Sequence, residues 1–112
     1  MMSFMKTDTA LTSSPQALAA SERLGEAIVQ ARKRRGLTQD TLATQAGLSK
    51  PTIQRLEKGH THLSVGRLFD LLDVLDPQLL EQVISVVEAD ELGQAMQAQR
   101  LPERVRRMRH DF

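Results

Sequence analysis

The stretch that decides the fold is QDTLATQAGLSKPTIQRLEKG, residues 39–59. Its first half has apolar residues at positions 42, 43 and 46, and its second half has them at positions 53 and 56. Spacings of three and four give each half a single buried face, which is typical of a helix. Between them, Gly47 can take the positive φ that ends a helix, and Ser49 can cap the next one. The stretch therefore predicts two short helices joined by a tight turn.

Two short helices joined by a tight glycine-containing turn form a helix-turn-helix, whose second helix fits the DNA major groove. We expect that second helix at residues 50–58. If Ile53 and Leu56 face inward, the accessible residues are Lys50, Pro51, Gln54, Arg55 and Lys58. Lys and Arg can donate to guanine, Gln can pair with adenine, and Pro51 or Thr52 can contact a thymine methyl group. The alternative is a solvated helix face, which any surface helix of this composition would show.

The helix before the turn offers a phosphate site. Thr38 is its expected cap, and Gln39 lies just inside its first turn. Free backbone N–H groups and the positive end of the helix dipole bind phosphate there, and a Gln side chain can add a donor. We therefore include Gln39 among the candidate DNA-binding residues.

A longer pattern, R-x-x-x-G-L-T-Q-x-x-L-A-x-x-A-G-L-S-x-x-x-I-x-x-L-E-x-G, runs from Arg32 to Gly59. The pattern resembles the Cro/XRE-type (phage-repressor-like) helix-turn-helix family. This resemblance implies an all-α, compact five-helix lambda-repressor-like domain, usually dimeric, on a two-fold operator. It also implies a structural role for Glu57. By position, it implies phosphate contacts from Gln39 and Ser49, base contacts from Lys50, Pro51 and Arg55, and flanking positions for Gln54 and Lys58.

Pro51 departs from that family pattern. The family often has Gln or another polar residue there, whereas proline cannot pair bidentately with a base. Base readout at this position then reduces to a methyl contact.

The charge of the chain is divided along its 112 residues. Residues 21–60 carry eight Lys and Arg against four Asp and Glu, residues 61–92 carry one against seven, and residues 93–112 carry five against two. The basic share coincides with the predicted helix-turn-helix, as a surface that faces phosphate requires. Four of these cations, at positions 32–35, end the preceding helix, where they either favour the helix terminus or contact phosphate.

The chain is predicted to contain one domain with extensions. We expect a flexible N-terminal arm at 1–20, a helix-turn-helix DNA-binding domain at 21–76, an apolar helix at 77–91 and a basic C-terminal tail at 92–112. Ser14 and Pro15 offer an earlier start for the first helix, as cap and first helical residue. Ser64 is the expected cap of a helix at 65–75, and a weak helix follows residue 90.

The apolar helix after Pro77 has two interpretations. Its apolar residues, with Val86 widening the stripe, either complete the core or form a dimer interface. A strand at 83–87 is a minor alternative because of the β-branched run. The tail that follows, with Arg104, Arg106, Arg107 and Arg109, is a solubilising tail, an arm along the DNA backbone or a partner-docking segment.

Several classes of protein are excluded or disfavoured. The chain has no Cys, so disulfides, thiolate metal sites and Cys nucleophiles are excluded. It has neither a phosphate-cradling Gly-rich loop nor a His–carboxylate spacing that would indicate an enzyme. His60 and His62 are interpreted as loop histidines, because only the distant His110 could join them on a metal. We predict no cofactor. No apolar run is long enough to span a membrane or serve as a signal peptide, so we predict a cytoplasmic protein.

The predicted function is a sequence-specific DNA-binding transcriptional repressor that acts as a homodimer on a palindromic operator. Its size and Arg-rich C-terminus also resemble HipB-type antitoxins, and that resemblance implies a HipA-type kinase toxin as partner and autoregulation of a shared operon. The alternatives are a stand-alone XRE-family regulator and a protein-interaction adaptor of the transcription machinery.

Overall fold

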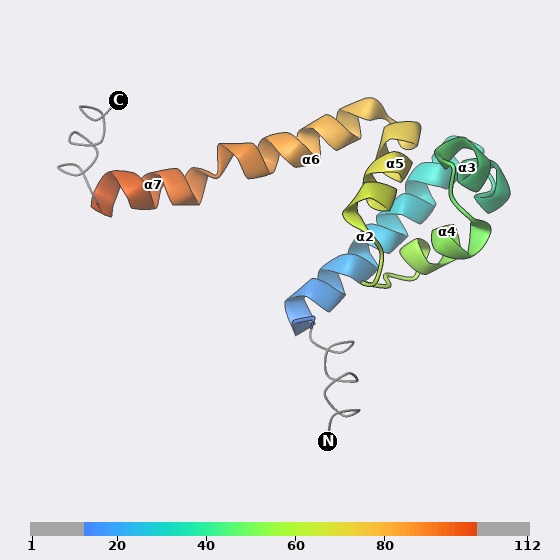
Figure 1. The fold of residues 1–112 in the computed structure, drawn as a ribbon, viewed down its shortest axis with the longest axis horizontal. Coiled ribbons are helices and arrows are strands. Elements are labelled where there is room, and N and C mark those ends of the chain that lie inside the picture. The colour runs from blue at the N-terminus through green and yellow to red at the C-terminus, as the bar shows by residue number, and fades with distance from the viewer. Residues whose placement is uncertain (1–12, 101–112) are drawn as a thin grey trace, which may run out of the picture. The chain divides into compact units, whose positions relative to one another are not determined.

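The computed structural model describes residues 13–100 and contains, within that range, six helices and no strand (Figure 1). The helices are α2 (Pro15–Arg34), α3 (Gln39–Ala46), α4 (Lys50–Glu57), α5 (Val65–Leu75), α6 (Pro77–Ala89) and α7 (Glu91–Arg100). The chain divides into two units, with the boundary between Leu80 and Glu81. The first unit contains α2–α5 and the start of α6, which confirms the all-α, five-helix domain. The strand alternative at 83–87 was wrong, because these residues lie within α6.

Helix α2 begins earlier than residue 21. The Ser14 hydroxyl accepts a hydrogen bond from the Ala17 N–H at 3.0 Å, and Pro15 occupies the first turn. Capping and the preset φ of proline favour a start at this point, and the alanines that follow are strong helix formers. Residues 15–20 therefore belong to the helix and not to the arm. The rest of the predicted arm, residues 1–12, lies outside the described residues.

The turn between α3 and α4 forms as the sequence predicted. Gly47 has φ 68°, and the next N–H, that of Leu48, donates to the Ala43 carbonyl at 2.9 Å. The Ser49 hydroxyl accepts from the Thr52 N–H at 3.2 Å and caps α4. A left-handed glycine followed by a serine cap ends one helix and begins the next within three residues.

The core of the first unit is aliphatic. Its buried hydrophobic residues are Ile28, Leu42, Ala43, Leu48, Ile53, Leu56, Leu71, Leu72 and Leu75. Leu79 and Leu80, at the start of α6, lie partly buried against this core. Leu24 of α2 and Val65 of α5 are apolar but lie outside this core, at 39% and 63% exposed. Of the 20 residues of α2, only Gly25 and Ile28 are buried, so most of the helix length lies outside the core.

Ala43 is a small buried residue at a core position of α3. It is 5% exposed and belongs to the same cluster as Ile53 of α4. We expect Ala43→Leu to lower the free energy of unfolding by about 1–3 kcal/mol, because added methyl groups force the neighbouring side chains or backbone to move. Thermal unfolding followed by circular dichroism measures this effect. An unchanged midpoint would contradict the close approach of the two helices.

The second unit has little burial of its own. Neither α6 nor α7 contains a buried residue, and Val86, Val87 and Leu92 are each more than 70% exposed. Asp90 joins the helices with a positive φ of 41°, and its carboxylate accepts from the Gly93 N–H at 3.1 Å. The weak helix predicted after residue 90 is thus present as α7. Among residues 13–100, no helix combines the length and hydrophobicity that crossing a membrane requires.

Candidate nucleic-acid interface

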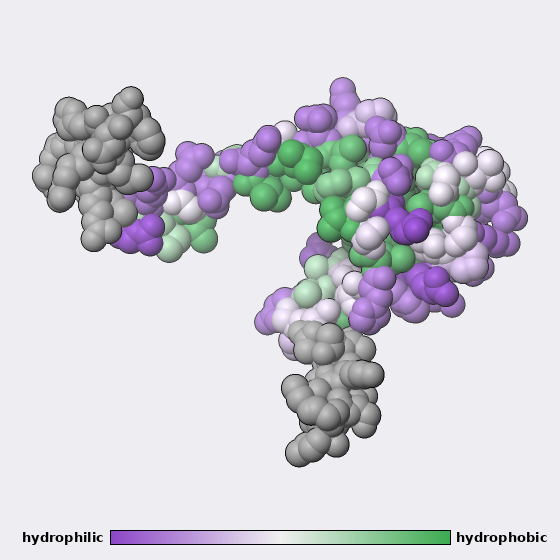
Figure 2. Space-filling model, in the orientation of Figure 1, coloured by the Kyte–Doolittle hydropathy of each residue, from purple (hydrophilic) through white to green (hydrophobic). Residues whose placement is uncertain are grey.

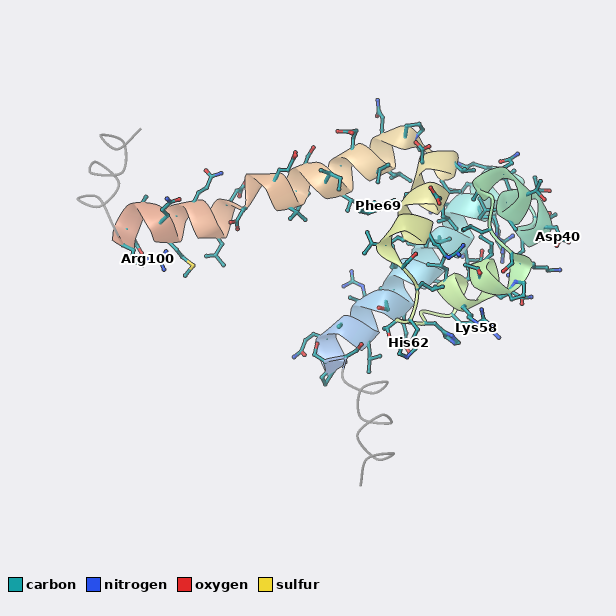
Figure 3. All side chains as sticks on the ribbon, viewed as in Figure 1. Asp40, Lys58, His62, Phe69 and Arg100 are labelled. Carbon is teal, nitrogen blue, oxygen red and sulfur yellow. The ribbon has the colours of Figure 1, made fainter. Side chains whose placement is uncertain are left out.

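One face of α4 is accessible and polar. Ile53 and Leu56 are 0% and 7% exposed, so they fix the inward face of the helix. The residues expected on the outward face are all accessible to solvent: Lys50, Pro51, Gln54, Arg55 and Lys58. Positions 50, 54 and 58 follow one another at a spacing of four residues, and positions 51 and 55 form a second row beside them. The five side chains therefore share one side of the helix. In Figure 3, Lys58 projects from the end of α4, and Figure 2 shows hydrophilic residues at the outer edge of α3 and α4.

Thr52 does not belong to this face. It is 8% exposed, and its hydroxyl lies 2.8 Å from the Ser49 hydroxyl. Thr52 stands three residues after the cap, where its N–H bonds to the capping side chain, so its own side chain is held beside Ser49. Thr52 therefore offers little surface to a thymine methyl group, and the exposed Pro51 is the better placed of the two candidates for that contact. Ser49 remains exposed at the N-terminus of α4, and its phosphate contact stays a prediction.

A buried ion pair fixes the far end of α4 to α2. The Arg32 guanidinium donates from Nε to Glu57 Oε2 at 2.7 Å and from Nη2 to Oε1 at 3.1 Å. Its Nη1 also donates to the Leu37 carbonyl at 3.0 Å. The two side chains are only 12% and 6% exposed. A bidentate pair of this geometry sets both the distance and the orientation of the two helices.

Gln39 joins the same carboxylate from α3. Its Nε2 donates to Glu57 Oε1 at 2.8 Å, and the residue is half-buried. The amide nitrogen carries two hydrogens, so one remains for a phosphate oxygen. Glu57 therefore connects three helices, α2, α3 and α4, and holds Gln39 at the start of α3.

The four cations at the end of α2 divide into two kinds. Arg32 bonds to Glu57, and Arg35 donates from Nε to the Leu75 carbonyl at the end of α5 at 2.9 Å. These two side chains connect the end of α2 to α4 and to α5. Lys33 and Arg34 are exposed, so the predicted phosphate contacts of this cluster apply to them.

Asp40 is a candidate interface residue that the sequence reasoning missed. Its carboxylate lies 3.5 Å from the Lys50 ammonium, and both side chains are exposed. Figure 3 shows Asp40 at the outer side of α3. A carboxylate at a protein–DNA surface repels phosphate but can accept from cytosine N4. No sequence signal points to this pair, because the two residues meet only through the turn between the helices.

The end of α4 also lies against the backbone of α2. A Cβ added at Gly25 would lie 2.5 Å from the Glu57 carbonyl oxygen and 2.7 Å from that of Leu56. At Gly59, with φ 83°, a Cβ would lie 2.7 Å from the Glu22 Cα. Glycine at both positions allows the two backbones to meet. This backbone contact and the hydrogen bonds of Glu57 fix the position of α4 against α2. They therefore also fix the positions of Arg55 and Lys58 on the domain surface.

The loop histidines show no metal cluster. His60 and His62 follow α4, and His62 is labelled in Figure 3. Within the portion of the chain that the structure describes, no group of three or more His, Cys, Asp or Glu side chains is arranged to hold a metal ion. His110, the other histidine considered for such a site, lies outside the described residues.

Comparison with known proteins agrees with the geometry. Residues 28–79, from the middle of α2 into α6, match a family model described as Helix-turn-helix. This match supports the resemblance of this region to the Cro/XRE-type helix-turn-helix family. Members of that family are DNA-binding regulators of transcription rather than enzymes. No curated protein matches the chain.

Proposed function

We propose that this helix-turn-helix protein is a sequence-specific transcriptional repressor that acts as a homodimer on a pseudo-palindromic operator. The observation that carries the proposal is the exposed face of α4, with Lys50, Gln54, Arg55 and Lys58 on a helix seated by Glu57 and Gly25. A rigid helix with donors on one side is suited to base recognition in the major groove. A dimer blocks a promoter when its operator overlaps the promoter.

The proposal gives each region of the face a task. Backbone N–H groups at the start of α3, the second hydrogen of the Gln39 amide and the Ser49 hydroxyl would bind phosphate and set the register. Lys50 and Arg55 would donate to base edges, and Pro51 would contact a thymine methyl group. Gln54 and Lys58 would flank the groove. Lys50 would leave Asp40 when it binds a base, at small cost because exposed ion pairs contribute only about 0–1 kcal/mol.

The second unit supports the homodimer. Within residues 81–100, the exposed large hydrophobic residues are Val83, Val86, Val87, Leu92 and Met96. Isolated helices shorter than about 12–15 residues are marginal in water, so α6 and α7 need a packing partner. A second copy supplies an equivalent apolar face, as two-fold association requires. Sedimentation at several protein concentrations tests this, and we expect Val87→Glu to weaken the dimer. A chain that stays monomeric while it saturates its operator would contradict the homodimer.

Arg55 carries the clearest prediction for recognition. We expect Arg55→Ala to weaken binding to the operator by about 1–3 kcal/mol and to relax the preference at one base pair, because a guanidinium pairs bidentately with guanine. The operator can be obtained by selection from random duplexes. Gel-shift titrations on this operator and on a random duplex, at one salt concentration, measure the two losses separately.

Arg55→Lys is the matched control for that prediction. It keeps the charge but not the planar pair of donors, so we expect most of the specificity to be lost and most of the binding to random DNA to remain. Equal losses on the operator and on random DNA for Arg55→Ala would count against a base-reading role. Such a result would leave Arg55 as a phosphate contact.

A narrower version of the proposal makes the protein an antitoxin that binds a HipA-type kinase toxin and represses their shared operon. The acidic residues Asp70 and Asp73 of α5 are accessible and suit a basic partner surface, and in the second unit Glu81 and Glu88 of α6 are accessible as well. The Arg-rich tail that prompted this comparison lies outside the described residues. A kinase gene beside this one and co-purification of its product would support the antitoxin role, and the absence of both would remove it. Footprinting then separates a stand-alone regulator from an adaptor, whose DNA binding would be sequence-blind.

A further inference from the structure

The first unit contains an apolar groove that includes none of the proposed DNA-binding residues. One wall is the N-terminal half of α2, with Ala17 and Leu24. The rest comes from Leu56 at the end of α4, Leu63 in the following loop, and Val65 and Leu68 of α5. The groove encloses about 270 Å³.

The groove gathers the accessible apolar side chains of this unit. Between residues 13 and 80, the exposed large hydrophobic residues are Leu18, Leu24 and Val65, at 45%, 39% and 63%. Two of them line the groove, and Leu18 follows Ala17 in α2. Contiguous exposed apolar patches mark interaction sites or ligand grooves, which makes this groove a candidate docking site. The volume is slightly below the range of about 300–1,000 Å³ for small-ligand sites, so one or two side chains fit it better than an effector molecule.

An apolar segment precedes the groove residue Ser13 in the sequence. Ser13, where the described structure begins, lines the groove. Residues 1–5 read MMSFM, so four of the five are large and apolar. Methionine adapts to irregular apolar surfaces, and phenylalanine has the largest apolar area of this set.

The connection between the segment and the groove is long enough and favours an intramolecular contact. Residues 6–12 can span up to about 23–25 Å, at roughly 3.3–3.6 Å per residue. A short tether between two parts of one chain also gives an effective concentration in the millimolar range, about 10⁻³ M. We propose that residues 1–5 dock in this groove of their own chain, with Phe4 against Leu24, Val65 and Leu68. The docked segment covers the apolar groove and holds the loop after α4 against α2.

Fluorescence tests the docking directly, because the chain has neither Trp nor Tyr. In Phe4→Trp the full-length protein has a single fluorophore in the segment, and Thr9→Trp provides a matched control in the linker. We expect the Trp at position 4 to emit at shorter wavelength than the Trp at position 9 and to be quenched less by acrylamide. The shift should be independent of protein concentration.

Groove variants supply the second arm of the test. Leu24→Gln with Val65→Glu, added to Phe4→Trp, should return the emission and the quenching to the values of the linker control. Both positions are accessible, and glutamate is favourable in the first turn of α5. Thr44→Glu, at an exposed site on α3, adds the same charge elsewhere and should leave the emission unchanged. Far-UV circular dichroism verifies that each variant is folded.

Three results would overturn the proposal. Emission from position 4 identical to that from position 9 would show that the segment is solvated. A blue-shifted emission that stays unchanged in the groove variants would show that the segment contacts another surface. A shift that grows with protein concentration would show that a second copy, and not the same chain, fills the groove.

Discussion

Replacing Glu57 by alanine is expected to lower the free energy of unfolding by about 3–5 kcal/mol, the range for removing one partner of a buried ion pair. Glu57 is the common acceptor of Arg32 and Gln39, and it is 6% exposed. Without it, the Arg32 guanidinium stays buried with one remaining partner, the Leu37 carbonyl. The same loss should weaken DNA binding, because α4 and the start of α3 are no longer held together.

The exposed ion pair of Asp40 and Lys50 provides the matched control. Its side chains are 73% and 47% exposed, so Asp40→Ala should change stability by only about 0–1 kcal/mol. Urea unfolding followed by circular dichroism, at one protein concentration, measures both variants. If Glu57→Ala were as mild as Asp40→Ala, the three-helix connection would not hold the domain together. Arg32→Met combined with Glu57→Leu should cost far less than Glu57→Ala, since no buried charge is left unpaired.

Gly25→Ala is expected to destabilise the domain although alanine is the better helix former. The added Cβ would lie 2.5 Å and 2.7 Å from two carbonyl oxygens of α4, so the helices must separate. We expect a cost of about 3 kcal/mol, at the upper end of the usual range for overpacking, because the obstacle is backbone rather than a movable side chain. Separation of α2 from α4 should also weaken operator binding, since it moves Arg55.

Gly66→Ala is the control with the opposite sign. Gly66 lies in α5, and a Cβ there would meet nothing within 4 Å. Alanine should therefore stabilise the helix by up to about 0.5–1 kcal/mol through its higher propensity. Denaturation midpoints of the two variants, measured side by side, separate close approach from helix propensity. A stabilising Gly25→Ala would show that α2 and α4 are not in backbone contact.

Much of the first unit could be predicted because its signals are local. Thr38, Ser49 and Ser64 each cap a helix through a hydrogen bond to an N–H three residues ahead. The turn at Gly47 is also a local signal, because glycine tolerates a positive φ wherever it occurs. Helical spacing also identified Leu42, Ala43, Ile53 and Leu56 as core residues of α3 and α4.

Two of the omissions concern contacts that local patterns do not encode. The bond from Gln39 to Glu57 and the approach of Gly25 to α4 join residues 18 or more positions apart. Nothing in a helical pattern distinguishes such a glycine from an incidental one. Thr52 was predicted to contact a base because the sequence does not show that its hydroxyl pairs with Ser49. That interaction competes with a role in base contact. The start of α2 was placed at residue 21, with Ser14 and Pro15 only as an alternative, because the Ser- and Thr-rich terminus outweighed that signal.

The geometry suggests why the recognition helix is so firmly held. Helix α4 has only eight residues, too few to be stable alone. Its apolar side reaches the core through Ile53 and Leu56, and its C-terminal end is fixed by Glu57 and by the contact with Gly25. A helix positioned in this way needs no ordering of its backbone on binding, so only its exposed side chains lose freedom. Specificity then depends on which side chains occupy the outer face.

The central claim is that the α4 face reads a DNA sequence as a two-fold pair of half-sites. Selection from a pool of random duplexes with the purified full-length protein, followed by sequencing, tests it most directly. We predict enrichment of two inverted half-sites whose centres lie about 10–10.5 base pairs apart, one turn of the double helix or a multiple of it. The same selection with Arg55→Ala should lose the preference at one position of each half-site. A pool that retains no common sequence, although the protein binds it, would contradict the claim.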